Sequence, residues 1–173
     1  MTESEIDSWS GAFGGLSSDD QLLVARLVKE GGAIKGTVEV IARRLRRTRN
    51  LALLRVKVSN RIVGVAALKT PTRTYRADKF AAAGVPIVDC ETALELGYVV
   101  IAEDMRGKKL SGGLCDAVAK EIRAPTFATT DSNPMKRNLQ RLGFTKAGWE
   151  WQGRKGALSL WTITHRSADS LGP

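Results

Sequence analysis

Residues 95–114 read ELGYVVIAEDMRGKKLSGGL, and the expected fold depends on the change of pattern inside this stretch. Its first part, Leu96 to Ile101, is apolar and rich in β-branched side chains, as is typical of a buried strand. From Leu110 onward the apolar residues recur at helical spacing until Pro125. The stretch therefore predicts a strand, a short basic turn that contains glycine, and a helix.

The turn before this helix has the composition of an anion-binding site. The first turn of a helix has four backbone N–H groups without an intrahelical partner and about half a positive charge. Arg106, Lys108 and Lys109 add cations at this end, where they are otherwise unfavourable for the helix. Small residues there would let a diphosphate approach the backbone closely. The alternative is a solvated basic turn whose glycines serve only the geometry of the chain.

Patterns elsewhere in the chain predict further helices and strands before and after this strand, turn and helix. Ser18 and Gln21 predict a capping box for the first helix, and Asn133 predicts an N-cap with Pro134 at the first helical position. The expected elements are helices at 18–30, 37–47, 75–83, 110–122 and 133–142, and strands at 54–58, 62–68, 96–101, 126–130, 144–148 and 157–164. No internal repeat interrupts this order. We therefore expect a single domain over residues 1–173, with an irregular segment at 1–16.

Composition excludes several classes of protein. The 173 residues are 43% apolar and 26% charged, which fits a globular domain rather than a disordered chain. No stretch approaches the ~18 apolar residues of a membrane span, and the first residues lack the basic and apolar parts of a signal peptide, so we expect a cytoplasmic protein without membrane contact. Cys90 and Cys115 are too few for a disulfide framework. With His165 as the single histidine, a metal site or a Ser-His-Asp triad is hard to assemble, and we expect no metal.

Two segments, Glu95 to Leu114 and Asn133 to Phe144, resemble the core of the GNAT superfamily, the acetyl-CoA-dependent N-acetyltransferases. The family has a strand, the pattern R/Q-x-x-G-x-G/A at the start of a helix, and a later helix that ends in a Leu-Gly-Phe-like corner. Here Lys109 stands at the first glycine of that pattern and Ser111 at the glycine or alanine. Lys109 can keep a helical φ, so the missing glycine matters only if this position needs a positive φ or a very close approach of the backbone. The resemblance, over about residues 50 to 164, implies an α/β (α+β) fold whose mixed, mostly antiparallel sheet is splayed around the cofactor strand, with helices on both faces.

The same resemblance implies acetyl-CoA as the cofactor and assigns residues to it. The backbone of the strand would pair with the pantetheine arm, and the amides of the turn would meet the diphosphate. Asn133 matches a position that often contacts the arm, although an N-cap role is compatible with its sequence context. The residues assigned to the cofactor are Val99, Val100, Ile101, Arg106, Gly107, Lys108, Lys109, Leu110, Ser111, Gly112 and Asn133.

Acetyl transfer to an amine needs a group that accepts a proton from the amine. Family enzymes commonly use a carboxylate, directly or through water. Glu95 is our first candidate, because alternation along the strand would place it on the same face as Val99 and Ile101. Glu91 is the second. The alternative for Glu95 is a solvated glutamate at the edge of a strand.

The departing thiolate needs a proton in turn, and the family commonly takes it from a tyrosine on the last helix. Aligned on the Leu-Gly-Phe corner, that position holds Leu139. Tyr98, Ser132 and Cys90 are the nearest substitutes in the sequence, and water is a further alternative. Tyr98 also fits a core or wall position in the strand.

The acceptor and the partners follow least directly from the sequence. A small-molecule or protein amine is expected, and in this fold the loop at 31–36 and the excursion at 70–88 would border the acceptor cleft. The run Arg43 to Arg49 and the net charge of +9 add a nucleic acid or an acidic protein as a partner. Two alternatives remain: an acyltransferase that acts on nucleic acid or aminoacyl-tRNA, and a catalytically idle acyl-CoA-binding module. Pairing through the C-terminal strands would give a homodimer.

Overall fold

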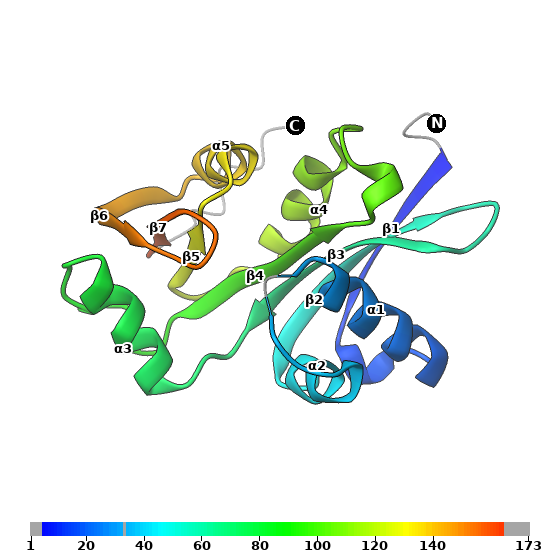
Figure 1. Cartoon of the computed structure of the whole chain (residues 1–173), viewed down its shortest axis with the longest axis horizontal. Helices are drawn as coiled ribbons and strands as arrows, with labels where there is room; N and C mark the ends of the chain where they lie inside the picture. The colour runs from blue at the N-terminus through cyan, green and yellow to red at the C-terminus, as the bar shows by residue number, and fades with distance from the viewer. Residues whose placement is uncertain (1–4, 33, 165–173) are drawn as a thin grey trace. The chain divides into compact units, whose positions relative to one another are not determined.

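The computed structural model describes residues 5–32 and 34–164, so that His165 lies outside the described residues. Seven strands form a sheet in the order β1-β2-β3-β4-β5-β7-β6 (Figure 1). The described ladders are antiparallel, except that between β4 and β5, which is parallel. The expected fold class, α/β with a mixed and mostly antiparallel sheet, is therefore confirmed. Within the described ranges no helix is both long and apolar enough to cross a membrane.

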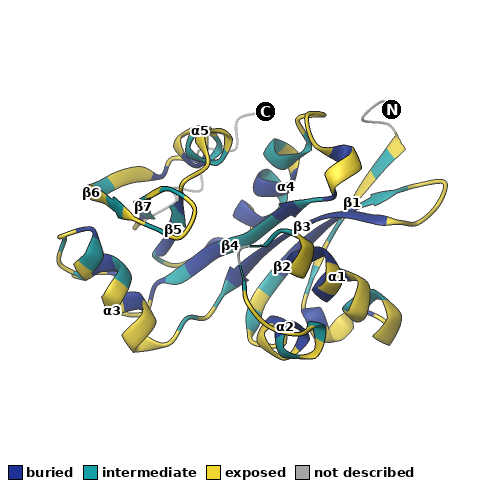
Figure 2. Ribbon diagram, viewed as in Figure 1, coloured by how far each residue is buried: buried dark blue, intermediate teal, exposed yellow. Residues whose placement is uncertain are grey.

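The chain forms two compact units, of which the first contains residues 1–69 and 96–121. Its strands are β1 (Ile6–Gly11), β2 (Thr48–Val56), β3 (Ile62–Lys69) and most of β4 (Leu94–Ile101), and its helices are α1 (Ser18–Glu30), α2 (Val38–Leu45), α4 (Leu110–Ala119) and the short 3-10 helices η2 (Phe13–Gly15) and η3 (Glu103–Met105). Every residue from Ile62 to Leu68 is buried, so both faces of β3 are covered (Figure 2). Helices α1 and α4 both pack against this strand.

Strand β1 lies within the segment that the sequence left irregular. It pairs in antiparallel fashion with β2, from Ile6 opposite Val56 to Gly11 opposite Leu51. Its residues are exposed or half-buried, so they lack the apolar alternation of a half-buried strand. Pairing of backbone groups with β2, rather than burial of side chains, therefore defines this strand.

The N-cap of α1 differs by one residue from the expected one. Ser17, not Ser18, is the N-cap of α1, and its hydroxyl accepts a hydrogen bond from the backbone N–H of Asp20 at 3.2 Å. Gln21 turns back to donate to the carbonyl of Leu16 instead of completing a capping box. Ser17 has the extended backbone that an N-cap requires, with a ψ of 156°. Thr37 caps α2 in the same way.

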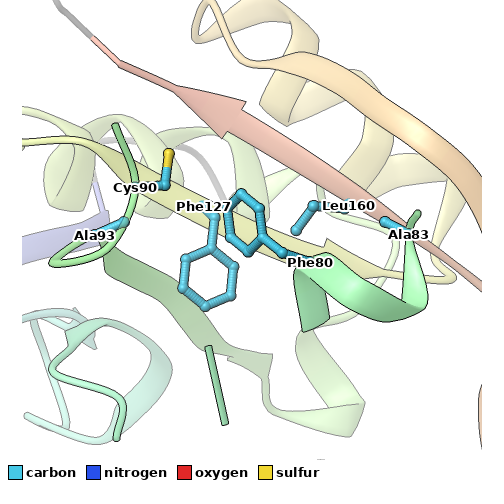
Figure 3. Packing of buried hydrophobic residues seen from close by; sticks show 6 residues of the cluster. All are labelled: Phe80, Ala83, Cys90, Ala93, Phe127 and Leu160. Carbon is cyan, nitrogen blue, oxygen red and sulfur yellow. The ribbon is translucent and has the colours of Figure 1, made fainter. Parts of the chain in front are cut away.

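The second unit contains residues 70–95 and 122–173. Its elements are α3 (Arg73–Ala82), the first residues of β4, β5 (Thr126–Thr130), α5 (Asn133–Arg141), β6 (Thr145–Gln152) and β7 (Ala157–Ile163). Phe80 of α3 and Phe127 of β5 meet edge to face at 5.6 Å between ring centroids. Figure 3 shows these rings within the core of the unit, together with Ala83, Cys90, Ala93 and Leu160. This core fixes α3 against the segment that leads into β4.

Two expected helix boundaries in the later part of the chain are wrong. Asn133 is the first residue of α5 and not its N-cap, because the hydroxyl of Ser132 accepts the hydrogen bond from the Met135 N–H. Helix α4 ends at Ala119, earlier than the apolar spacing indicated, and Ile122 lies beyond it. Apolar spacing continues past α4 because Ile122 is still buried outside the helix.

Candidate functional site

Strand β4 is irregular at Tyr98. This residue has a φ of 52°, in the left-handed region, which costs an L-residue about 1–2 kcal/mol. The irregular residue interrupts the strict alternation of side chains, so the expectation that Glu95 shares a face with Val99 and Ile101 no longer follows from spacing. The ladder to β5 consists of two pairs in the described chain, at Leu94 and Glu95.

The side chain of Lys69, at the end of β3, lies over this irregular part of β4. Its Nζ is 4.5 Å from the centroid of the Tyr98 ring. A Cβ at Gly97 would come within 2.7 Å of the Lys69 Cε, so glycine makes this approach possible. Tyr98, one of the predicted catalytic residues, thus has an ammonium group against its ring.

The turn between β4 and α4 uses two left-handed residues. Gly107 has a φ of 79° and Lys109 a φ of 58°. Of the two alternatives for Lys109, the structure therefore shows the one in which this position needs the positive φ for which glycine is best suited. A Cβ at Gly107 or at Gly113 would meet nothing within 4 Å among the described residues. Side chains at these two positions would therefore have free space among the described residues.

The start of α4 differs from that of the other α-helices in the described chain. In α1, α2, α3 and α5 a serine or threonine hydroxyl accepts a hydrogen bond from the first turn. The N-cap of α4 is Lys109, which supplies no such bond, and the first turn has no acidic residue. Arg106, Lys108 and Lys109 are all exposed around it. A helix N-terminus with these neighbours is electrostatically suited to an anionic ligand.

The three strand residues predicted to hold the pantetheine arm have different surroundings. Val100 is buried against the end of α1, where a Cβ at Gly31 would lie 2.5 Å from the Val100 Cγ2. Val99 and Ile101 are half-buried. The carbonyl of Ile101 accepts a hydrogen bond from the Arg106 Nε at 3.3 Å. One backbone group of this segment is therefore already bonded to the turn that follows it.

Glu95 is buried in the second unit. Its exposed fraction is 4%, and its Oε1 accepts a hydrogen bond from the Tyr75 hydroxyl at 3.1 Å. The alternative of a solvated glutamate is therefore wrong. A carboxylate has the chemistry to accept a proton, and the hydrogen bond from Tyr75 fixes the orientation of this one.

Arg76 fixes the segment that leads to Glu95. Its guanidinium is buried and donates to three carbonyl groups: Nε to Ala93 at 2.9 Å, Nη2 to Pro71 at 3.1 Å, and Nη1 to Glu91. Sequence analysis assigned neither Tyr75 nor Arg76 to the site. A tyrosine and an arginine in an amphipathic helix carry no signal of their contacts, because most of those contacts, with Glu91, Ala93 and Glu95, are made with residues 15 or more positions away.

The remaining candidates occupy positions with other evident roles. Ser132 caps α5, and Asn133 is exposed beside it. Cys90 is in the core of the second unit, where burial, followed by the charges of Asp89 and Glu91, raises its pKa. Leu139 is fully buried and apolar, so it offers no proton. Glu91 is exposed.

No protein-family model and no curated protein sequence matches this chain. Solved structures do share its fold. A GNAT superfamily phosphinothricin acetyltransferase from Sinorhizobium meliloti, in complex with acetyl-CoA, is 11% identical, with a TM-score of 0.66 over 98% of this chain and 93% of its own. An acyl-CoA N-acyltransferase from Pseudomonas aeruginosa is 12% identical, with a TM-score of 0.63 over 92% of this chain and 99% of its own.

A third structure extends the comparison over the whole chain. The ribosomal-protein-S5-alanine acetyltransferase from Vibrio fischeri is 14% identical, with a TM-score of 0.62 over 100% of this chain and 98% of its own. The chain therefore has the acyl-CoA N-acyltransferase fold of the GNAT acetyltransferases. At the level of fold, the resemblance inferred from the two sequence segments is confirmed.

Proposed function

We propose that this chain is an acetyl-CoA-dependent N-acetyltransferase that transfers the acetyl group directly to a primary amine. The observation that carries the proposal is the start of α4, a basic turn with left-handed residues and no side-chain cap. A structural neighbour with the same fold holds acetyl-CoA. Amides between Gly107 and Gly112 would hold the diphosphate, whereas the Arg106 amide already donates to the Glu103 carbonyl at 3.2 Å. The backbone of Val99 and Val100 would pair with the pantetheine arm, and Asn133 would contact that arm.

Acetyl-CoA, when bound, supplies an activated carbonyl carbon and a thiolate leaving group. Glu95 would accept a proton from the acceptor ammonium, so that the neutral nitrogen can attack. Transfer would form a carbon–nitrogen bond and break the carbon–sulfur bond, and the hydroxyl of Tyr98 or a water molecule would protonate the sulfur. A backbone N–H of β4 would stabilise the oxyanion.

Turnover of Glu95→Gln tests this assignment. Release of coenzyme A from acetyl-CoA would be followed with methylamine, lysine, spermidine and an alanine-initiated tetrapeptide amide as acceptors. We expect the variant to lose about 10²-fold or more in kcat, the usual contribution of a general base. Its pH optimum should move upward, because solvent must then deprotonate the amine.

Calorimetry of acetyl-CoA binding separates this loss from a loss of affinity. We expect Glu95→Gln to bind acetyl-CoA as the wild type does, with Glu91→Gln as the matched control for an exposed glutamate in the same segment. A kcat and pH profile unchanged in Glu95→Gln would remove the base assignment. A wild-type protein that releases no coenzyme A with any of these acceptors would support an acyl-CoA-binding module instead.

A second candidate function, acylation of a nucleic acid or aminoacyl-tRNA, is favoured by the surface at the end of α2. We call this the arginine surface; its members are Arg43, Arg44, Arg46, Arg47 and Arg49. All five are exposed, and none forms an ion pair with a described residue. Arg43 and Arg44 also suit the negative end of the helix dipole, but the other three lie beyond the last helical residue. A surface of guanidinium groups is suited to phosphates.

Salt-dependent binding tests this second candidate. We expect tRNA and duplex DNA to bind with an affinity that falls steeply with salt concentration. The triple variant R43Q/R46Q/R47Q should weaken binding about tenfold or more and flatten the salt dependence. The control R26Q/R137Q/K155Q removes three exposed charges from other elements. Equal losses in the two variants would indicate attraction by net charge alone and would contradict a role for the arginine surface.

A further inference from the structure

The pair of Tyr75 and Glu95 joins a buried carboxyl group to a side chain that reaches solvent. Tyr75 lies in the first turn of α3, donates its hydroxyl hydrogen to Glu95 Oε1 at 3.1 Å, and is 37% exposed. Glu95 is 4% exposed. A base in this position must return each proton that it accepts to solvent before the next turnover. The Tyr75 hydroxyl is in contact with the base and lies on a side chain that solvent reaches.

Contacts of the Tyr75 ring and of helix α3 fix the position of Tyr75. Lys79, one turn later in α3, has its Nζ 4.9 Å from the centroid of the tyrosine ring. At the other end of the helix, the Trp149 Nε1 donates to the carbonyl of Ala82 at 3.0 Å. Arg76, the residue after Tyr75, bonds the chain on both sides of the helix and the segment before Glu95. The hydroxyl is therefore positioned before any ligand binds.

We propose that Tyr75 is a positioning and relay residue, which orients the Glu95 carboxylate and passes its proton to solvent. The inference rests on the proposed function, because it requires Glu95 to act as the base. The ammonium nitrogen first gives a proton to the carboxylate. The resulting carboxylic acid then donates to the Tyr75 oxygen while the tyrosine releases its own hydroxyl proton to water. One proton leaves the amine and one proton reaches water, and Tyr75 is neutral before and after.

Tyr75→Phe tests the relay, because it removes the hydroxyl and keeps the ring over which Lys79 lies. With the most active of the four acceptor amines, we expect kcat to fall about tenfold, KM to stay within about twofold, and the melting temperature to stay unchanged. Thr74→Val is the matched control, since it removes a hydroxyl from an exposed neighbour in α3. We expect its kcat to equal that of the wild type.

A double variant distinguishes the relay from a structural role. If Tyr75 acts through Glu95, Tyr75→Phe has no further effect on kcat in the Glu95→Gln background, and the two single losses do not add. Additive losses, or a Tyr75→Phe kcat within twofold of the wild type while Glu95→Gln is impaired, would overturn the relay and leave the proposed function intact. An unimpaired Glu95→Gln would overturn both.

Discussion

At the scale of single residues, backbone strain is concentrated near the predicted cofactor segment. Four described non-glycine residues have a positive φ. Two of them lie in this segment: Tyr98 is within β4, and Lys109 is the N-cap of α4. Such residues cost free energy and persist where the surrounding structure determines them, often at functional sites. The strain at Lys109 is open to a direct measurement of stability.

Lys109→Gly should stabilise the protein by about 0.5–1 kcal/mol, since glycine adopts a positive φ without the clash of a Cβ but loses more entropy on folding. Urea unfolding measures this difference. Lys108→Gly is the control, because Lys108 is an exposed lysine in the same turn that is not among the residues with a positive φ. A loss of stability in both variants would show that Lys109 is not left-handed in the protein.

This turn also shows what the sequence could predict at the scale of residues. Gly107 and the basic side chains indicated an anion site, and the structure shows an exposed turn at residues 106–109 and no side-chain cap on α4. The lysine itself carries no signal of a positive φ, and the one indication of the conformation of Lys109 was the glycine that the family pattern has at this position. Burial of Glu95 and its bond to Tyr75 depend on contacts 20 positions apart in the chain, which spacing does not encode.

At the scale of elements, an ion pair joins α1 to β2. The Arg55 guanidinium meets the Asp20 carboxylate through both of its terminal nitrogens, at 3.3 and 2.8 Å. Hydrogen bonding to Arg55 holds the pKa of Asp20 below its ordinary value of 3.8. The pair is partly buried, with side-chain exposures of 15% for Arg55 and 25% for Asp20.

Asp20→Asn should lower the free energy of unfolding at pH 7 by about 1 kcal/mol. Because the folded pKa of Asp20 is lowered, its contribution is complete above the ordinary value of 3.8 and is lost as the pH falls through the lowered value. The stabilities of variant and wild type should therefore converge in acid. Unfolding curves at several pH values measure this, with Asp19→Asn as the control in the same first turn. A difference that persists below both values would contradict the ion pair.

Two elements of the second unit could be predicted from the sequence pattern. The strand Thr126–Thr130 has the expected bounds, and the helix from Arg73 to Ala82 lies where the amphipathic stretch indicated one. Strand β1 was missed because its contacts are backbone hydrogen bonds to β2, which do not depend on side-chain pattern. The predicted N-caps of α1 and α5 each lie one residue after the observed caps, Ser17 and Ser132. In both helices two adjacent polar residues satisfy the same cap preference.

At the scale of the whole molecule, the proposed function depends on the fold and on the predicted anion site at the start of α4. The fold follows from the order of the strands and from the solved structures that share it. The net charge of +9 is compatible with an anionic cofactor and with the arginine surface alike. The proposed binding of acetyl-CoA at the start of α4 is therefore best tested with a substitution that lowers the affinity for acetyl-CoA without lowering the stability of the fold.

Calorimetric titration of Ser111→Glu with acetyl-CoA is that test. A glutamate at the second position of α4 favours the helix dipole, so the melting temperature should hold or rise, while repulsion of the diphosphate should weaken binding by about tenfold or more, or about 1.4 kcal/mol. Thr74→Glu places the same charge at the second position of the capped helix α3 and should leave the affinity unchanged. Acetyl-CoA that binds Ser111→Glu as tightly as the wild type, or that fails to bind the wild type, would contradict the account.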